Sequence, residues 1–171
     1  MSDEKAHGIA LLRGDLAIAR GALEAGVTLV TSYPGAPISD VLPALAKLGT
    51  DSGVVARWAV NEKVALEEAF GASLAGRRAM AVVKNVGFNV AMDALITITY
   101  VGCRGGLVLV VGEDPGGTAS ATEQDSRFAL RMTETLVLEP SSPQESKEMV
   151  REAFSLSEEL QLPVVIRTST R

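Results

Sequence analysis

Short apolar runs rich in β-branched residues alternate along the chain with longer segments whose apolar residues recur at helical spacing. This pattern predicts six strands and five helices. We expect the strands at Thr28–Ser32, Val54–Val60, Arg78–Lys84, Leu107–Gly112, Thr135–Glu139 and Val164–Arg167. We expect the helices at Asp15–Ala25, Ile38–Leu48, Glu62–Ala75, Asn89–Val101 and Gln144–Leu160.

The regular alternation of strand and helix predicts an α/β fold with a mostly parallel sheet of about six strands and helices on both faces. Ala79–Val83 and Leu107–Val111 are continuous apolar runs, which are typical of strands covered on both sides. A chain of 171 residues is long enough for one domain with its own core. We therefore expect a flexible leader at residues 1–9 and one domain at residues 10–171.

The composition excludes several kinds of chemistry. Cys103 is the only cysteine, so the sequence supports no disulfide, structural zinc site or cysteine-held cluster. The only histidine, His7, lies in the polar leader, which disfavours a nucleophile–histidine site. With 16 basic and 21 acidic residues the net charge is −5, and no apolar run reaches the roughly 20 residues of a membrane helix. We expect a cytoplasmic protein that binds neither nucleic acid nor membrane and holds no metal with its own residues.

Ligands of open α/β sheets bind at the carboxyl ends of the strands, so the loops that follow the strands are the candidate site. The segment Tyr33–Pro37 reads locally as a tight turn because of its prolines and glycine. Asn61 and Glu62 read locally as an N-cap and a first-turn acid, although a buried carboxylate that shares a proton with a ligand nitrogen fits the same position. Spacing alone does not choose between these readings.

Two further loops have unusual features. Lys84 ends an apolar strand, and Gly87 shortly after it would allow the backbone to approach a ligand closely. The loop Glu113–Asp125 is long for a compact α/β unit and reads either as a mobile lid or as a surface for a partner chain. The common nucleotide-binding glycine motifs are absent from the sequence.

Taken in order, the motifs resemble those of a known family, the 2-oxoacid:ferredoxin oxidoreductases. The resemblance is to their N-terminal domain, is closest to the indolepyruvate oxidoreductase α subunit, and covers about Ala10 to Arg171. The motifs that carry it are Leu12…Ala17-Ile-Ala-Arg20-Gly-Ala…Ala25-Gly, Tyr33-Pro-Gly-Ala-Pro, Val60-Asn-Glu-Lys-Val-Ala-Leu-Glu67, Gly71-Ala-Ser-Leu-Ala-Gly76, Lys84-Asn-Val-Gly-Phe-Asn89, Glu123-Gln-Asp-Ser-Arg127 and Leu138-Glu-Pro-Ser141.

The resemblance implies the pyrimidine-binding half of a thiamine diphosphate site. It places on Glu62 the catalytic glutamate that shares a proton with N1′ of the aminopyrimidine and so activates the cofactor. It implies further cofactor-binding residues at Tyr33, Pro34, Gly35, Lys84, Asn85, Gly87 and Asn89, and a substrate side at Ala36, Pro37, Gln124 and Asp125. Many members have Thr where this sequence has Ala36, which leaves a smaller apolar wall that would suit a bulkier 2-oxoacid or signal weakened catalysis.

The resemblance also implies partners. The family holds the diphosphate and Mg²⁺ on a second domain or subunit, and passes electrons through iron–sulfur clusters to a ferredoxin-type acceptor. None of those motifs occurs in this sequence, so we expect an oligomer that completes the cofactor site across an interface and oxidatively decarboxylates an indolepyruvate- or pyruvate-type 2-oxoacid. Two alternatives stay open, namely the α subunit of a two-chain thiamine-dependent decarboxylase and a non-catalytic interaction module of the same fold.

Overall fold

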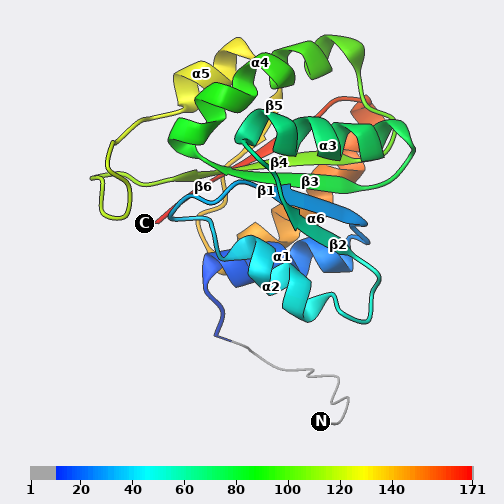
Figure 1. Cartoon of the computed structure of the whole chain (residues 1–171), viewed down its shortest axis with the longest axis horizontal. Helices are drawn as coiled ribbons and strands as arrows, with labels where there is room; N and C mark the ends of the chain where they lie inside the picture. Colours follow the sequence, from blue (N-terminus) through cyan, green and yellow to red (C-terminus); the bar gives the residue numbers. More distant parts are fainter. Residues whose placement is uncertain (1–10, 171) are drawn as a thin grey trace.

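Six short apolar strands form one sheet in the computed structural model, which describes residues 11–170. The strand order is β2-β1-β3-β4-β6-β5, and every neighbouring pair is parallel (Figure 1). The predicted α/β class, with its mostly parallel sheet of about six strands, is therefore confirmed. The predicted leader at residues 1–9 lies outside the described residues.

The helices connect successive strands. The strands are β1 (Leu29–Ser32), β2 (Val55–Trp58), β3 (Ala79–Lys84), β4 (Leu107–Glu113), β5 (Leu136–Leu138) and β6 (Val164–Ser169). The helices are α1 (Gly14–Glu24), α2 (Val41–Leu48), α3 (Glu62–Leu74), α4 (Asn85–Val101), α5 (Arg127–Met132) and α6 (Pro143–Leu160). None of these helices in residues 11–170 is long and apolar enough to span a membrane.

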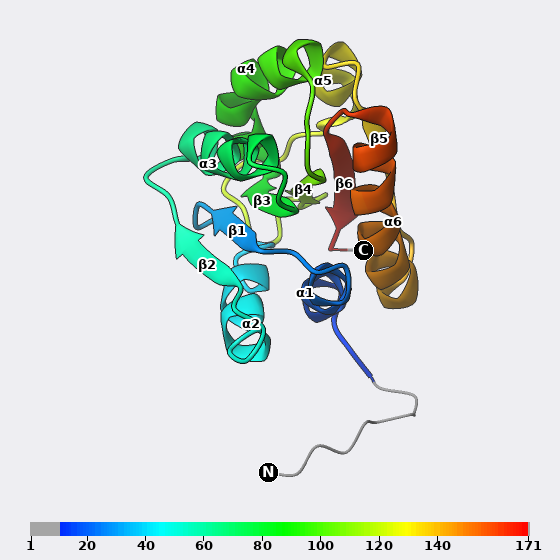
Figure 2. The ribbon, with the colours of Figure 1, turned by 90° about the vertical axis from the view of Figure 1, so that its right-hand side faces the viewer.

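The two faces of the sheet carry separate cores. Helices α1, α2 and α6 pack on one face, where Ile18, Leu45 and Phe154 are fully buried. Helices α3, α4 and α5 cover the other face through buried side chains that include Leu66 and Phe88. The sheet therefore forms the middle of three layers, as the view along the strands shows (Figure 2). Burial on both faces explains why the central strands are continuously apolar.

Two helix starts differ from the prediction by more than two residues, and one helix was not predicted. Helix α4 begins at Asn85, not Asn89, because Lys84 adopts the extended N-cap conformation and the helix starts at once. Helix α2 begins at Val41, not Ile38, because residues 36–40 form turns after Pro34-Gly35. Helix α5 was not predicted, since this short element buries only one residue, Leu130.

Two helix starts are capped by side chains, and the cap at Asn61 was predicted. The Asn61 side chain accepts a hydrogen bond from the backbone N–H of Val64 at 2.9 Å and caps α3. The Ser142 side chain accepts one from the N–H of Glu145 at 3.2 Å, ahead of a first-turn proline, and caps α6. Each cap satisfies an N–H group that lacks an intrahelical partner.

We predict that Gly21→Ala destabilises the fold. A Cβ atom at Gly21 would lie 2.5 Å from the carbonyl oxygen of Lys147, so α1 would have to move away from α6. We expect a loss of about 1–3 kcal/mol in the free energy of unfolding, measured in urea. Gly71→Ala is the matched control, because a Cβ there meets no atom within 4 Å and alanine favours a helix. Equal stabilities of the two variants would contradict the prediction.

Candidate functional site

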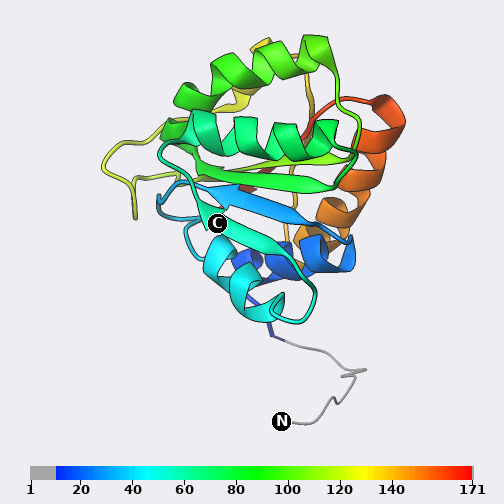
Figure 3. The same cartoon turned by 45° about the vertical axis from the view of Figure 1, so that its right-hand side comes forward.

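The carboxyl ends of the strands bring the predicted site residues to one edge of the sheet. The parallel register pairs Ser32 with both Trp58 and Val82, and Lys84 with Gly112, so these strands end side by side. The β1–α2 and β4–α5 loops project from this edge (Figure 3). Strand topology thus positions loops that are far apart in sequence.

Glu62 is the first residue of α3 and is nearly buried, with a relative exposure of 7%. Asn61 already provides the N-cap, so the Glu62 carboxylate is not needed for that purpose. No hydrogen-bond donor and no cation is paired with this carboxylate among residues 11–170. Burial without a protein partner leaves the carboxylate available to a ligand donor.

The backbone of α4 approaches Glu62 at Gly87. A Cβ atom on Gly87 would lie 2.8 Å from the Cδ carbon of Glu62, closer than ordinary side chains allow. The glycine therefore leaves room for the Glu62 side chain against the first turn of α4. This contact joins two of the predicted site residues directly.

The β1–α2 loop packs against the end of β3. The backbone N–H of Gly35 donates to Ser39 Oγ at 2.9 Å, which fixes the turn. A Cβ on Gly35 would lie 2.7 Å from the Cδ carbon of Lys84, so the aliphatic part of Lys84 occupies that space. Tyr33, Pro34 and Ala36 are exposed on the same loop.

The long β4–α5 loop is held against both neighbouring loops. Asp114 Oδ2 accepts hydrogen bonds from the backbone N–H groups of Ala119 and Ser120, and Ser120 Oγ donates to the Ala36 carbonyl at 3.1 Å. Farther along, the Gln124 side chain exchanges hydrogen bonds of 2.7 and 2.8 Å with Asn89. The loop therefore bridges the β1–α2 turn and the start of α4.

Asn85 is fully buried and is committed to the protein. Its Nδ2 donates to the backbone carbonyl of Gln124 at 3.0 Å, and its Oδ1 accepts from the N–H of Val86 at 2.9 Å. Nδ2 thus holds the β4–α5 loop on α4, while Oδ1 satisfies a backbone N–H in the first turn of α4. Asn85 shapes the site through that loop.

Arg167 of β6 anchors the end of the long loop. Its guanidinium contacts Glu113 at 3.2 Å, Asp125 at 3.3 Å and Glu139 at 3.0 Å. Hydrogen bonds from Arg127, with a smaller contribution from Arg167, lower the pKa of Asp125 to about 2. Asp125 is therefore ionised at neutral pH, and its charge is balanced by two arginines.

The structure brings several of the predicted site residues into contact with one another. Glu62 touches Gly87, and Lys84 touches Gly35, while Gln124 joins the β4–α5 loop to α4. Sequence reasoning did not find the roles of Asp114, Ser120 and Arg167. An arginine directly after the apolar run Val164–Ile166 was a possible signal, because a cation at the end of a buried strand usually has a partner.

A surface cavity of about 380 Å³ lies elsewhere, between α1, α6 and the start of β3. It is lined by Glu24, Ala25, Arg78, Glu148, Arg151, Glu152 and Ser155. Its two cations are already paired, Arg151 with Glu24 and Arg78 with Glu158 at 2.6 Å. We place the candidate site at the carboxyl edge because the nearly buried Glu62 has no such partner among the described residues.

Comparisons with known proteins agree with this fold. A 2-oxoglutarate:ferredoxin oxidoreductase from Magnetococcus marinus, solved with 2-oxoglutarate, coenzyme A and succinyl-CoA bound, matches with a TM-score of 0.84. The identity is 20%, and the match covers 92% of this chain and 29% of that chain, so it shows a shared fold. The architecture is that of a thiamine diphosphate-binding α/β domain of the pyrimidine type.

The family follows from the sequence match. The model for "Pyruvate flavodoxin/ferredoxin oxidoreductase, thiamine diP-bdg" matches residues 20–170, and the chain belongs to this family. Indolepyruvate oxidoreductase subunit IorA of Pyrococcus abyssi is 47% identical over 161 residues, which are 94% of this chain and 25% of the relative. Ketoisovalerate oxidoreductase subunit VorB of Methanothermobacter thermautotrophicus is 26% identical over 92% of this chain and 47% of its own length. The chain thus spans about a quarter of the length of its indolepyruvate relatives, and the predicted resemblance is confirmed.

We predict that Arg167→Met loosens the β4–α5 loop. The variant leaves the buried carboxylate of Glu113 without its cation, so the free energy of unfolding should fall by about 3 kcal/mol. Hydrogen–deuterium exchange should accelerate across residues 114–126. Arg131→Met is the control, because Arg131 is exposed and forms no ion pair within residues 11–170. Unchanged exchange in the loop would refute the anchoring role of Arg167.

Proposed function

We propose that this chain is the pyrimidine-side domain of a thiamine diphosphate-dependent 2-oxoacid oxidoreductase, of the indolepyruvate or pyruvate type. The observation that carries the proposal is the carboxylate of Glu62, which is nearly buried at a strand-to-helix junction and has no partner among the described residues. Family membership supports the choice of cofactor. The names of the relatives support the class of reaction.

The described residues fit the pyrimidine half of this cofactor. Gly87 supplies a close backbone approach beside Glu62, and a side chain at that position would displace the carboxylate. Glu62 would hold a proton shared with the ring nitrogen N1′, and its burial would strengthen that bond by excluding water. When bound, the cofactor supplies a nucleophilic carbon that attacks the 2-oxoacid carbonyl and an electron sink for loss of carbon dioxide.

The loops around Glu62 would orient the cofactor and the substrate. We expect Tyr33, Pro34, Gly35, Lys84, Gly87 and Asn89 to face the cofactor. Asn85 would act on the site through the β4–α5 loop that it holds. We expect Ala36, Pro37, Gln124 and Asp125 to border the substrate. The Asn85–Gln124 and Ser120–Ala36 hydrogen bonds support this arrangement because they hold the substrate-side loop against the cofactor-side elements.

The site requires a partner domain or subunit. Glu62 and its neighbours can bind only the pyrimidine end, and no cluster of potential metal ligands occurs within residues 11–170. We propose that the diphosphate and its Mg²⁺ bind to another part of the assembled protein and that the iron–sulfur clusters also lie there. We propose a ferredoxin-type electron acceptor. The short match to the relatives, about a quarter of their length, is consistent with such a division.

We predict that Glu62→Gln in the assembled enzyme lowers 2-oxoacid turnover by about 100-fold or more. The amide has nearly the same size as the carboxylate but can no longer share a proton as an acid. Turnover would be measured as 2-oxoacid-dependent reduction of a ferredoxin or dye. Glu67→Gln is the matched control on the same helix, since Glu67 is exposed and its one ion pair within residues 11–170 is with Lys63. Full turnover by Glu62→Gln would exclude the proposed role.

We predict that Gly87→Ala weakens cofactor binding. The new methyl group would displace the Glu62 side chain, so the dissociation constant of thiamine diphosphate should rise by about 10-fold or more. Tryptophan fluorescence or calorimetry would report binding without any need for turnover. Gly71→Ala is again the control, and an equal affinity of both variants would contradict the close approach as the reason for the glycine.

A further inference from the structure

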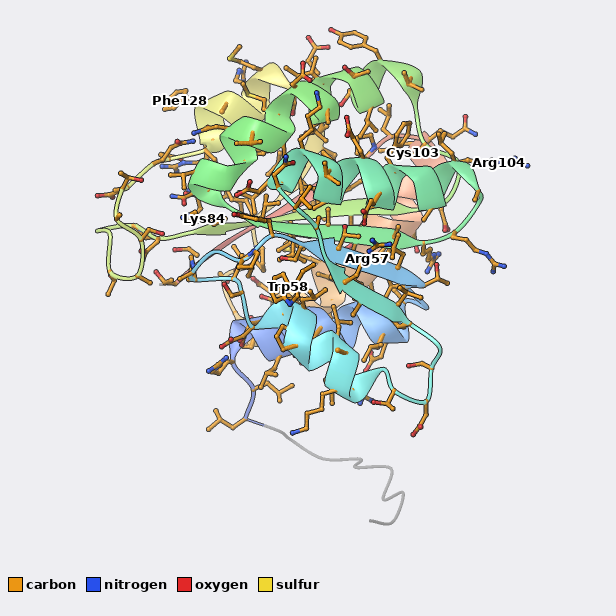
Figure 4. All side chains as sticks on the ribbon, viewed as in Figure 1. Arg57, Trp58, Lys84, Cys103, Arg104 and Phe128 are labelled. Atoms are coloured by element: carbon orange, nitrogen blue, oxygen red, sulfur yellow. The ribbon has the colours of Figure 1, made fainter. Side chains whose placement is uncertain are left out.

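The Lys84 side chain lies at the carboxyl edge of the sheet. Its ammonium group has no carboxylate partner among residues 11–170. Lys84 is the last residue of β3 and comes directly before α4, so its backbone is fixed at both ends. Its Cγ and Cδ atoms fill the space above Gly35. Figure 4 shows Lys84 at the edge where β1 and β3 end, opposite the end that carries Cys103 and Arg104. Its position is therefore tied to the candidate site.

The other cations around this edge are already neutralised. Each of them pairs with at least one carboxylate in the described structure: Arg13 with Asp15 and Asp40, Arg57 with Glu68, Lys63 with Asp93, Arg127 with Asp125, and Arg167 with Glu113, Asp125 and Glu139. For Lys84, no hydrogen bond or ion pair of the ammonium group occurs within residues 11–170. An ammonium group held beside a site in this way is suited to an anionic ligand.

We propose that the Lys84 ammonium group binds the carboxylate of the 2-oxoacid substrate. This inference rests on the proposed function and assigns one residue within it. A single uncommitted cation matches the single charge of a carboxylate. A diphosphate would require several donors or a metal ion, and the paired cations of the described residues cannot supply them. The methylene groups of Lys84 would still line the cofactor side beside Gly35.

The chemistry of the reaction fixes the kinetic signature of such a contact. The carboxylate carries its charge in the bound substrate and loses that charge when the C1–C2 bond breaks and carbon dioxide leaves. The electrons of the broken bond would stay on the former carbonyl carbon, for which the cofactor would supply the electron sink when bound. A cation on the carboxylate therefore favours substrate binding and does not favour the bond-breaking step. Its removal should therefore raise KM without lowering kcat.

The test is Lys84→Met in the assembled enzyme. Methionine keeps an unbranched stem against Gly35 but carries no charge. We expect KM for the 2-oxoacid to rise about 10- to 100-fold, from the loss of one charge-assisted hydrogen bond, while the thiamine diphosphate dissociation constant stays unchanged. The carboxylic acid that lacks the 2-oxo group but is otherwise the same as the substrate would serve as an inhibitor. Its inhibition constant should rise by the same factor. Lys84→Arg should recover most of the affinity because it restores the charge.

Lys47→Met is the control, because Lys47 is exposed on α2 and has no ion pair in the described part of the chain. An unchanged KM for the 2-oxoacid in Lys84→Met would overturn the inference. A raised dissociation constant of thiamine diphosphate, with an unchanged inhibition constant of the carboxylic acid, would also overturn it. That second result would assign Lys84 to the diphosphate. Either result leaves the proposed function standing if the wild-type enzyme turns over 2-oxoacids and Glu62→Gln does not. An assembled wild-type enzyme without 2-oxoacid turnover would instead refute the proposed function itself.

Discussion

In a parallel sheet every strand ends at the same edge, and the whole candidate site depends on that constraint. β1 leads into the turn with Gly35, β2 leads to Glu62, β3 ends in Lys84, and β4 leads into the long loop. The helices that return the chain are apolar on their inner faces and contribute only their first residues to the site. Residues separated by tens of positions in sequence therefore meet without any need for a long structured loop.

The contacts that hold this edge together differ widely in strength. The Lys63–Asp93 pair is mostly exposed, so solvent screens it and it contributes little to stability. The Arg167–Glu113 pair is shielded from solvent, so its loss would leave the buried Glu113 carboxylate as an unsolvated charge. The close approaches at Gly87 and Gly35 involve no attraction of their own. They matter because any side chain there would force Glu62 or Lys84 out of place.

Much of the fold was predictable from the sequence, because the central strands are continuous apolar runs and α6 has a strong N-cap. The start of α4 was missed because Gly87 reads locally as a loop residue, whereas its neighbour Phe88 is buried and continues the helix.

The site was only partly predictable. Local pattern explains Asn61 as a cap but does not decide whether Glu62 is a first-turn acid or a ligand-binding carboxylate. The family resemblance was needed to single out Glu62. Arg167 was missed because its partner Glu113 lies in a different strand, and only the sheet order brings them together.

The position of β6 has a consequence for the order of folding. It is the last strand along residues 11–170, yet it lies inside the sheet, between β4 and β5. Until β6 inserts, β5 has no strand to pair with and Glu113 has no cation. Local helices such as α3 and α4 can form early, but closing contacts between distant segments takes longer. The β4–α5 loop therefore lacks its Arg167 anchor until this strand has docked, so the site is complete only once β6 is in the sheet.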